Sequence, residues 1–231
     1  MKSAARRLPR RISCEIPGDW MDRLFTAQEM AKIAGAGCEG CGACCRDMGE
    51  SVRLDPLDVH ELTLHLSRSF ADLVDSAIGL HAEDGVILPH LLMTSAEPVP
   101  QCVFLQDDGR CGIHDFRPGL CRLFPLGRNY DGASFQYFVV EGACSLPGRT
   151  KVRIDKWLGV SEIKPYEKFI SDWHYFVKAL KERISHISDP EEVRALNLQL
   201  LETFYVTPYD PMRNFYNQFG MRLLRARRTM L

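Results

Sequence analysis

Four cysteines within eight residues constrain this chain more than any other feature. The segment CEGCGACC contains Cys38, Cys41, Cys44 and Cys45, with glycines interleaved among them. The chain has nine cysteines, and eight of them lie between residues 38 and 144, in segments with the character of loops or hairpins. Cysteines that only fill a core are scattered through helices and strands. Their concentration here indicates a dedicated chemical role.

Disulfide bonds explain this pattern poorly. An odd number of cysteines leaves one thiol unpaired, and pairs within residues 38–45 would close small, strained rings. The basic segment 1–15 is not followed by the apolar stretch of a signal peptide. No apolar run approaches the roughly 20 residues that cross a bilayer. We therefore expect a cytoplasmic protein whose thiols stay reduced.

Metal ligation explains the pattern better. The C-x₂-C-x₂-C run of Cys38, Cys41 and Cys44 lets one loop turn three thiolates towards a single centre, and the glycines let backbone amides approach the sulfurs. Bacterial ferredoxins use this spacing, with a remote fourth cysteine that completes the cluster. Zinc accepts the same thiolates, but the usual zinc pattern of two separated C-x₂-C knuckles is absent. The spacing favours an iron–sulfur centre and leaves zinc as the alternative.

Cys45 directly follows Cys44, which raises the question of how many centres there are. In an extended backbone, neighbouring side chains point to opposite faces. The two thiolates could then serve different centres, or one could be a reactive thiol. Eight cysteines suit two sites of four ligands, and one cluster with spare cysteines stays open.

Two long motifs resemble a known family. The segments CEGCGACC and CVFLQDDGRCGIHDFRPGLCRLFPLGR, with GAC at residues 142–144, resemble the CxxCxxCC family of zinc- or iron-chelating proteins, also called YkgJ-type cysteine-cluster proteins. The resemblance runs from about Cys38 to Cys144 and leaves Cys14 outside. It implies one set of metal ligands: Cys38, Cys41, Cys44, Cys45, Cys102, Cys111, Cys121 and Cys144.

The same resemblance leaves catalysis open. Flagellin lysine-N-methylase contains a similar cysteine cluster, which implies that some members support protein methylation. This chain has no strand–glycine-loop–helix signature for S-adenosylmethionine, and no nucleophile–base signature, P-loop or HExxH motif. A protein-modifying enzyme of that kind therefore remains an alternative only.

Basic residues flank the last cysteines. Four thiolates on Zn²⁺ or on a [4Fe–4S]²⁺ cluster leave a net negative centre, which favours nearby donors and positive charge. Arg117 and Arg122 could therefore bind the sulfurs or an anionic substrate. An ordinary ion pair with an acid such as Asp115 is the alternative. His114, three residues after Cys111, is a further candidate ligand.

The expected fold is α+β, with an irregular, cysteine-rich, metal-binding half packed on a mainly α-helical C-terminal bundle. A capping box at Thr26–Glu29 predicts a helix that ends at about Ala34. The first half adds further signals: helix caps at Asp55 and Ser69, a hairpin around Asp108-Gly109, a short helix between Pro118 and Pro125, and a strand over 134–140.

After residue 150 the apolar residues repeat at helical spacing. We expect a long amphipathic helix from Tyr166 to Ile184, and two more helices capped at Asp189 and at Asp210. The implied organisation is a basic, flexible arm (1–19), a cysteine-cluster metal-binding region (20–150) and a helical region (151–231).

Charge is distributed unevenly along the chain. Residues 1–14 and 221–231 carry basic side chains and no acid, so all 30 acidic residues lie between them. An acidic body makes nucleic acid an unlikely partner. The sequence therefore predicts a metal-binding, iron–sulfur protein with a redox or enzyme-associated role and an unknown protein or redox partner. The alternative is a structural-zinc binding module for a protein partner.

Overall fold

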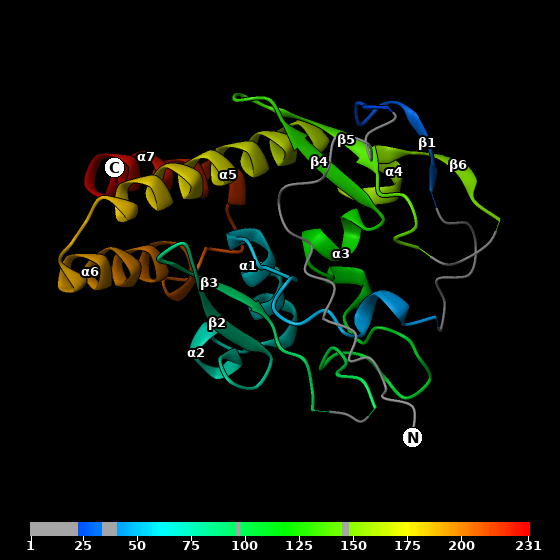
Figure 1. Ribbon diagram of the computed structural model, residues 1–231, viewed down its shortest axis with the longest axis horizontal. Coiled ribbons are helices and arrows are strands. Elements are labelled where there is room, and N and C mark those ends of the chain that lie inside the picture. The colour runs from blue at the N-terminus through cyan, green and yellow to red at the C-terminus, as the bar shows by residue number, and fades with distance from the viewer. Residues whose placement is uncertain (1–22, 34–40, 96–97, 145–147) are drawn as a thin grey trace, which may run out of the picture.

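The computed structural model describes residues 23–33, 41–95, 98–144 and 148–231, and its architecture is the expected α+β (Figure 1). Small strand pairs and short helices form the first two thirds of the chain, and long helices form the last third. The strands are β1 (Met30–Ile33), β2 (Ile78–Glu83), β3 (Val86–Leu91), β4 (Leu126–Tyr130), β5 (Phe135–Val139) and β6 (Thr150–Arg153). The α-helices are α1 (Pro56–Leu66), α2 (Phe70–Leu73), α3 (Gly119–Leu123), α4 (Ile154–Leu158), α5 (Ile163–Ser185), α6 (Pro190–Leu201) and α7 (Phe215–Met230). Two short 3₁₀ turns, η2 (Ala43–Cys45) and η3 (His114–Phe116), lie in the cysteine-rich segments, and a π-helical segment, η4 (Glu202–Val206), continues α6.

The strands form three separate antiparallel pairs. β2 pairs with β3 and β4 with β5, each through a short hairpin. β1 pairs with β6, so that Met30 faces Arg153 and Ile33 faces Thr150. This last pair joins the start of the described chain to the entry of the helical region.

The helix expected from Thr26 is wrong, because the segment forms a turn followed by β1. The local contacts that prompted the expectation are present: the Glu29 carboxylate accepts hydrogen bonds from the Thr26 amide at 2.8 Å and from its hydroxyl at 3.1 Å. They close a single turn, since Met30–Ile33 then pairs with β6 and buries Ala31 and Ile33 on alternate residues. A capping box reports on one turn and cannot reveal a strand partner that lies far along the chain. The expected end at Ala34 lies outside the described residues.

The other signals of the first half correspond to observed elements. The carboxylate of Asp55 caps α1, and the hydroxyl of Ser69 caps α2. Around Gly109 the chain reverses as predicted, with backbone hydrogen bonds from the Gln106 amide to the Arg110 carbonyl and from the Gly112 amide to the Phe104 carbonyl, both at 2.8 Å. Leu105 and Cys111 form an isolated antiparallel bridge there, and the described residues form no strands on either side of the turn. The predicted short helix is α3 and the predicted strand is β5.

The helical half follows its apolar periodicity. α5 buries the expected stripe, including Phe169, Trp173 and Phe176, and Asp189 caps α6. The predicted start of the last helix at Asp210 is wrong, because α7 begins at Phe215, where the Asn214 side chain accepts the Asn217 amide. The Asp210 carboxylate closes a preceding turn by accepting the Met212 amide.

One apolar core includes side chains from α1, the β2–β3 hairpin and the long helices. Leu62, Leu91, Leu180 and Phe204 are among its fully buried members. In Figure 1 the hairpin lies beside α5 and α6, with α1 between it and α3. No helix in the described segments is long and apolar enough to cross a membrane.

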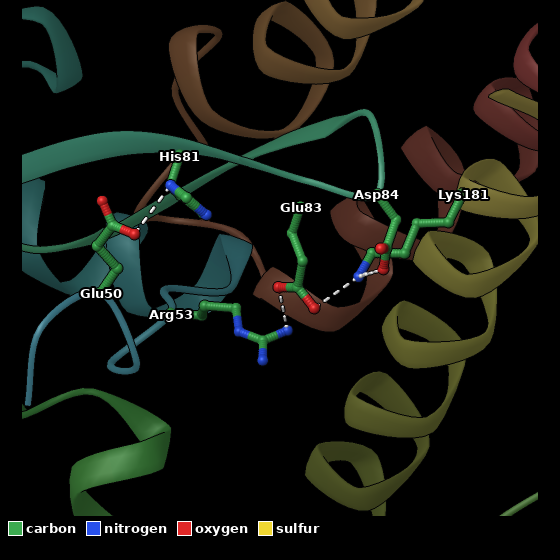
Figure 2. Close-up of polar contacts among 6 residues, drawn as sticks. All are labelled: Glu50, Arg53, His81, Glu83, Asp84 and Lys181. Carbon is green, nitrogen blue, oxygen red and sulfur yellow. Dashed lines mark hydrogen bonds and ion pairs between the residues drawn. The ribbon is translucent and has the colours of Figure 1, made fainter. Parts of the chain in front are cut away.

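Ion pairs join the tip of the β2–β3 hairpin to α5. Figure 2 shows the Glu83 carboxylate between the Arg53 guanidinium, at 2.7 Å, and the Lys181 ammonium, at 2.8 Å. Lys181 also reaches Asp84 at 3.1 Å. Lys181 is mostly buried, so these charges interact more strongly than pairs in open water.

Candidate metal centre

The described cysteines of the centre come from three short segments. Cys44 and Cys45 lie on η2, Cys102 and Cys111 lie on either side of the turn at Gly109, and Cys121 lies on α3. The first two segments are joined through the backbone, since the Cys102 amide donates to the Cys45 carbonyl at 2.8 Å. The backbone alone therefore holds the segments of Cys45 and Cys102 side by side, although they lie far apart in the sequence.

The thiols of these five residues lie near enough to affect one another electrostatically. The Cys45 thiol donates a hydrogen bond to the Cys44 sulfur, which lowers the pKa of Cys44 to about 7 and raises the pKa of Cys45. Charge on Cys44 would raise the pKa of Cys102, Cys111 and Cys121. We call these five side chains the thiol group: Cys44, Cys45, Cys102, Cys111 and Cys121.

Burial is the main electrostatic influence on the inner thiols. It raises the pKa of Cys102, of Cys111 and most strongly of Cys121, because desolvation disfavours a thiolate. A cation bound among these sulfurs would compensate for that loss of hydration and replace their protons. The donor chemistry of the thiol group therefore fits a thiophilic metal.

Gly42 is required where the cysteine loop meets the Gly109 turn. Its φ is +59°, in the left-handed region, and a Cβ there would lie 3.1 Å from Leu105 Cδ1 and 3.4 Å from the Gly109 carbonyl oxygen. A side chain would be strained and would also push the two segments apart. This close approach is what brings η2 next to Cys102 and Cys111.

The remaining candidate ligands are less closely associated. Cys41 is exposed and Cys144 is half-buried, and no contact of either thiol with the thiol group appears among the described residues. Cys38 and Cys14 lie outside the described residues. Across residues 23–33, 41–95, 98–144 and 148–231, no set of three or more His, Cys, Asp or Glu side chains is already arranged to hold a metal ion.

Arg117 directly follows η3, and Arg122 lies on α3 beside Cys121. The positive charge of Arg117 lowers the pKa of Cys44 and of Cys111. Arg122 donates to two main-chain carbonyls, that of Arg117 at 2.9 Å and that of Asp115 at 2.7 Å. The contact of Arg122 with Asp115 is therefore a hydrogen bond to the main-chain carbonyl, not an ion pair with the carboxylate. The exposed ring of His114 lies within 2.7 Å of Arg117 Nη1.

Arg128, the third arginine of this segment, lies in the interior. Its Nη2 donates to the Tyr166 hydroxyl at 2.9 Å. Its charge also faces Asp55, whose pKa burial raises to about 6. Arg128 therefore belongs to a buried polar network between β4, α1 and α5, next to the thiol group.

Sequence reasoning missed Asp58, which ties α1 to the cysteine-bearing α3. Its buried carboxylate accepts the Gly119 amide at 2.7 Å and the Asp55 amide at 3.0 Å. Burial raises the pKa of Asp58. A Cβ on Gly119 would lie 2.9 Å from the Tyr166 hydroxyl, so the backbone of α3 must approach closely. The signal available in the sequence was the capping box Asp55–Asp58, but a capping box predicts only the start of a helix and no contact with α3.

Two surface hollows lie elsewhere. One, of about 290 Å³, is lined by α6, η4 and α7, and the other, of about 300 Å³, by α4 and the segment after it. No cysteine lines either hollow.

The comparison with known proteins agrees with the cysteine pattern. Residues 37–145 match the family model CxxCxxCC, described as "Putative zinc- or iron-chelating domain". No curated protein and no solved structure matches the chain. The matched segment contains all five members of the thiol group, together with Cys38, Cys41 and Cys144. The resemblance expected from the motifs is confirmed over residues 37–145, which match the CxxCxxCC domain.

Proposed function

We propose that the domain binds a metal centre through its clustered cysteine thiolates. One observation carries the proposal: the Cys102 amide donates to the Cys45 carbonyl at 2.8 Å, and five thiols from three segments distant in sequence lie near enough to shift one another's pKa. Core packing does not require five thiols in one place, and a soft metal is the usual partner of such a set. The proposed ligands are Cys38, Cys41, Cys44, Cys45, Cys102, Cys111, Cys121 and Cys144.

We propose an iron–sulfur centre, of the [4Fe–4S] type, as the group bound. The C-x₂-C-x₂-C run has the spacing of a ferredoxin-type loop, and eight cysteines exceed the four that one zinc ion needs. The 3₁₀ turn η2, entered through Gly42, curls the loop at Cys44 and Cys45. Such a centre, when bound, supplies one-electron transfer.

The basic side chains suit an anionic centre. In this proposal Arg117, which directly follows η3, offsets negative charge at Cys44 and Cys111. Arg122 holds this part of the backbone through its bonds to the carbonyls of Asp115 and Arg117. Charge and hydrogen bonds around the sulfurs tune the reduction potential of a cluster. We propose a redox or enzyme-associated role in the cytoplasm, with a protein or redox partner.

The test is the metal content of protein purified without oxygen. We expect broad absorption near roughly 400 nm that dithionite bleaches, with iron and acid-labile sulfide in about equal amounts, as a [4Fe–4S] centre requires. A colourless protein that holds about two zinc ions, and takes up no iron on anaerobic reconstitution, would instead establish the structural-zinc alternative. A protein that holds neither metal would refute metal binding itself.

A further inference from the structure

The outer face of α7 carries a narrow apolar ridge that the fold leaves uncovered. The inner face buries Phe215, Phe219 and Leu223 in the core. On the opposite face, Met221 is 60% exposed and Leu224 is 62% exposed. We define the α7 ridge by five exposed residues of this face and of the position directly after it: Asn217, Met221, Leu224, Arg228 and Leu231.

The spacing of the ridge is that of a helix–helix seam. Its members follow one another at intervals of four and three residues, which is the a/d repeat of a heptad. The polar members Asn217 and Arg228 do not break this pattern, since single polar residues at such positions set register and partner. Exposed apolar side chains repeated in this way indicate a surface that pairs with a second helix.

The charged residues of α7 itself have one sign. Residues 211–231 contain five arginines and no acid. Two of them have roles within the fold: Arg222 donates to carbonyls of the η4 region, and Arg227 pairs with Asp172 at 3.3 Å. Arg225 and Arg228 are exposed, and neither side chain has a hydrogen-bond or ion-pair partner in the segments described. Their charge is thus free to meet a negatively charged partner.

We infer that the α7 ridge docks an acidic amphipathic helix of a partner protein. Apolar residues at the a and d positions of that helix would cover Met221 and Leu224, and carboxylates at its flanks would meet Arg225 and Arg228. Complementary charges at the flanks of a seam select the partner and its orientation. This surface lies outside residues 37–145, so the inference is independent of which metal the domain binds.

A second copy of the chain and a lipid bilayer are the other candidates to cover the α7 ridge, and both agree less well with these observations. A second copy of the chain would bring Arg225 and Arg228 against the same charges, and like charges across a seam repel. A bilayer favours a helix with a wide apolar face. Here the apolar stripe is only as wide as a seam, and the other side of α7 is held in the core. The exposed stripe is short, so we expect a weak, transient complex.

The test uses two matched synthetic peptides of three heptads, both with Leu at a and d. One carries Glu at e and g, the other Lys. Each is titrated into the purified, metal-loaded protein with isotope-labelled methionine methyl groups, so that the Met221 signal reports binding. We expect the Glu peptide to bind at least about tenfold more tightly than the Lys peptide, a difference of about 1.4 kcal/mol. Arg225→Glu with Arg228→Glu should reverse that preference.

A second variant tests the apolar part of the seam. Met221→Gln with Leu224→Gln should abolish binding of the Glu peptide. The fluorescence anisotropy of the peptide measures this binding. Met30→Gln, which changes another exposed apolar residue, on β1, should leave binding unchanged. Circular dichroism checks that all variants fold.

Four results would overturn the inference. These are equal binding of the two peptides, binding of neither, attachment to phosphatidylserine vesicles that depends on Met221 and Leu224, and a dimer in sedimentation that the same substitutions dissociate. The last two would assign the ridge to a membrane and to a second copy of the chain, respectively.

Discussion

At the scale of single residues, buried polar groups and glycines decide how the cysteine segments meet. Asp58 is the clearest case, because its carboxylate holds the N-terminus of α3 and so the backbone that carries Cys121. A buried amide that loses its acceptor costs about 1–3 kcal/mol. Asp58 therefore stabilises both the fold and the position of one proposed ligand.

Replacement of Asp58 tests this link. Asp58→Ala should lower the free energy of unfolding by about 1–3 kcal/mol, because the Gly119 amide stays buried without a partner. It should also reduce the metal retained after dialysis, since α3 is no longer held against α1. Urea denaturation and metal analysis measure the two effects.

Asp72→Ala is the matched control. It removes the same capping-box position from α2, where the exposed Asp72 carboxylate accepts hydrogen bonds from Ser69 and, among the described residues, from no other element. We expect a loss within about 1 kcal/mol and normal metal content. Equal losses in the two variants would mean that the bond between α1 and α3 contributes nothing beyond helix capping.

Gly127 allows a second close approach. A Cβ at Gly127 would lie 2.3 Å from the ring of Phe138, its cross-strand partner in the β4–β5 hairpin. Gly127→Ala should therefore destabilise the protein by about 1–3 kcal/mol, as overpacking does. Gly220→Ala, in the open surface of α7, should instead stabilise it by about 1 kcal/mol through helix propensity. Thermal unfolding of both variants checks the opposite signs, and two changes of the same sign would contradict the prediction.

At the scale of elements, the strand hairpins dock on α5 through specific side chains. The β2–β3 hairpin uses the Glu83–Lys181 pair seen in Figure 2. The β4–β5 hairpin uses Tyr130, whose ring stacks on that of His174 at a centroid distance of 3.5 Å and an angle of 6°. Burial and, after it, nearby positive charge together lower the pKa of His174 to about 4. These charges belong to Lys178, Arg128, Lys181 and Arg53.

The lowered pKa predicts a loss of stability in acid. The unfolded chain binds a proton at His174 below about pH 6.5, whereas the folded protein does not until about pH 4. The contribution of His174 to stability should therefore decline as the pH falls through this window. The melting temperature of wild type should drop more between about pH 7 and about pH 5 than that of His174→Phe, which keeps the stacked ring. Parallel pH profiles would show that His174 titrates no differently in the folded state.

At the scale of the whole molecule, the thiol group and the helices share one core. Cys102, Leu105 and Ile113 are buried in the same apolar cluster as the faces of α5 and α7. The cysteine segments around them have few regular elements of their own. Ligation in structural thiolate zinc sites supplies about 10–16 kcal/mol in peptides. We therefore expect metal binding to contribute much of the stability of this part.

Removal of two proposed ligands tests that expectation. Cys41→Ser with Cys44→Ser should yield protein depleted in metal and cleaved readily by proteases before residue 150. Cys14→Ala, outside the matched segment, should keep the metal content and spectrum of the parent. A double variant with normal metal and normal protease resistance would refute the ligand assignment, and metal loss in Cys14→Ala would show that the cysteines are divided wrongly.

The sequence by itself determined the features that depend on a few neighbouring residues. Asp55, Ser69 and Asp189 mark helix starts because a cap needs only the next turn of backbone. The apolar stripe of α5 predicted its buried face because helical spacing is local. The cysteine motifs likewise carried the resemblance to the CxxCxxCC family, and that resemblance implied the candidate ligands.

Only the tertiary structure decided the features that join distant segments. The turn at Thr26 leads into a strand because β1 pairs with β6, and this pairing buries Ala31 and Ile33. The thiol group and the bond from Gly119 to Asp58 likewise depend on which surfaces bury one another. Burial across long chain separations is a property of the assembled core, and no local pattern contains it.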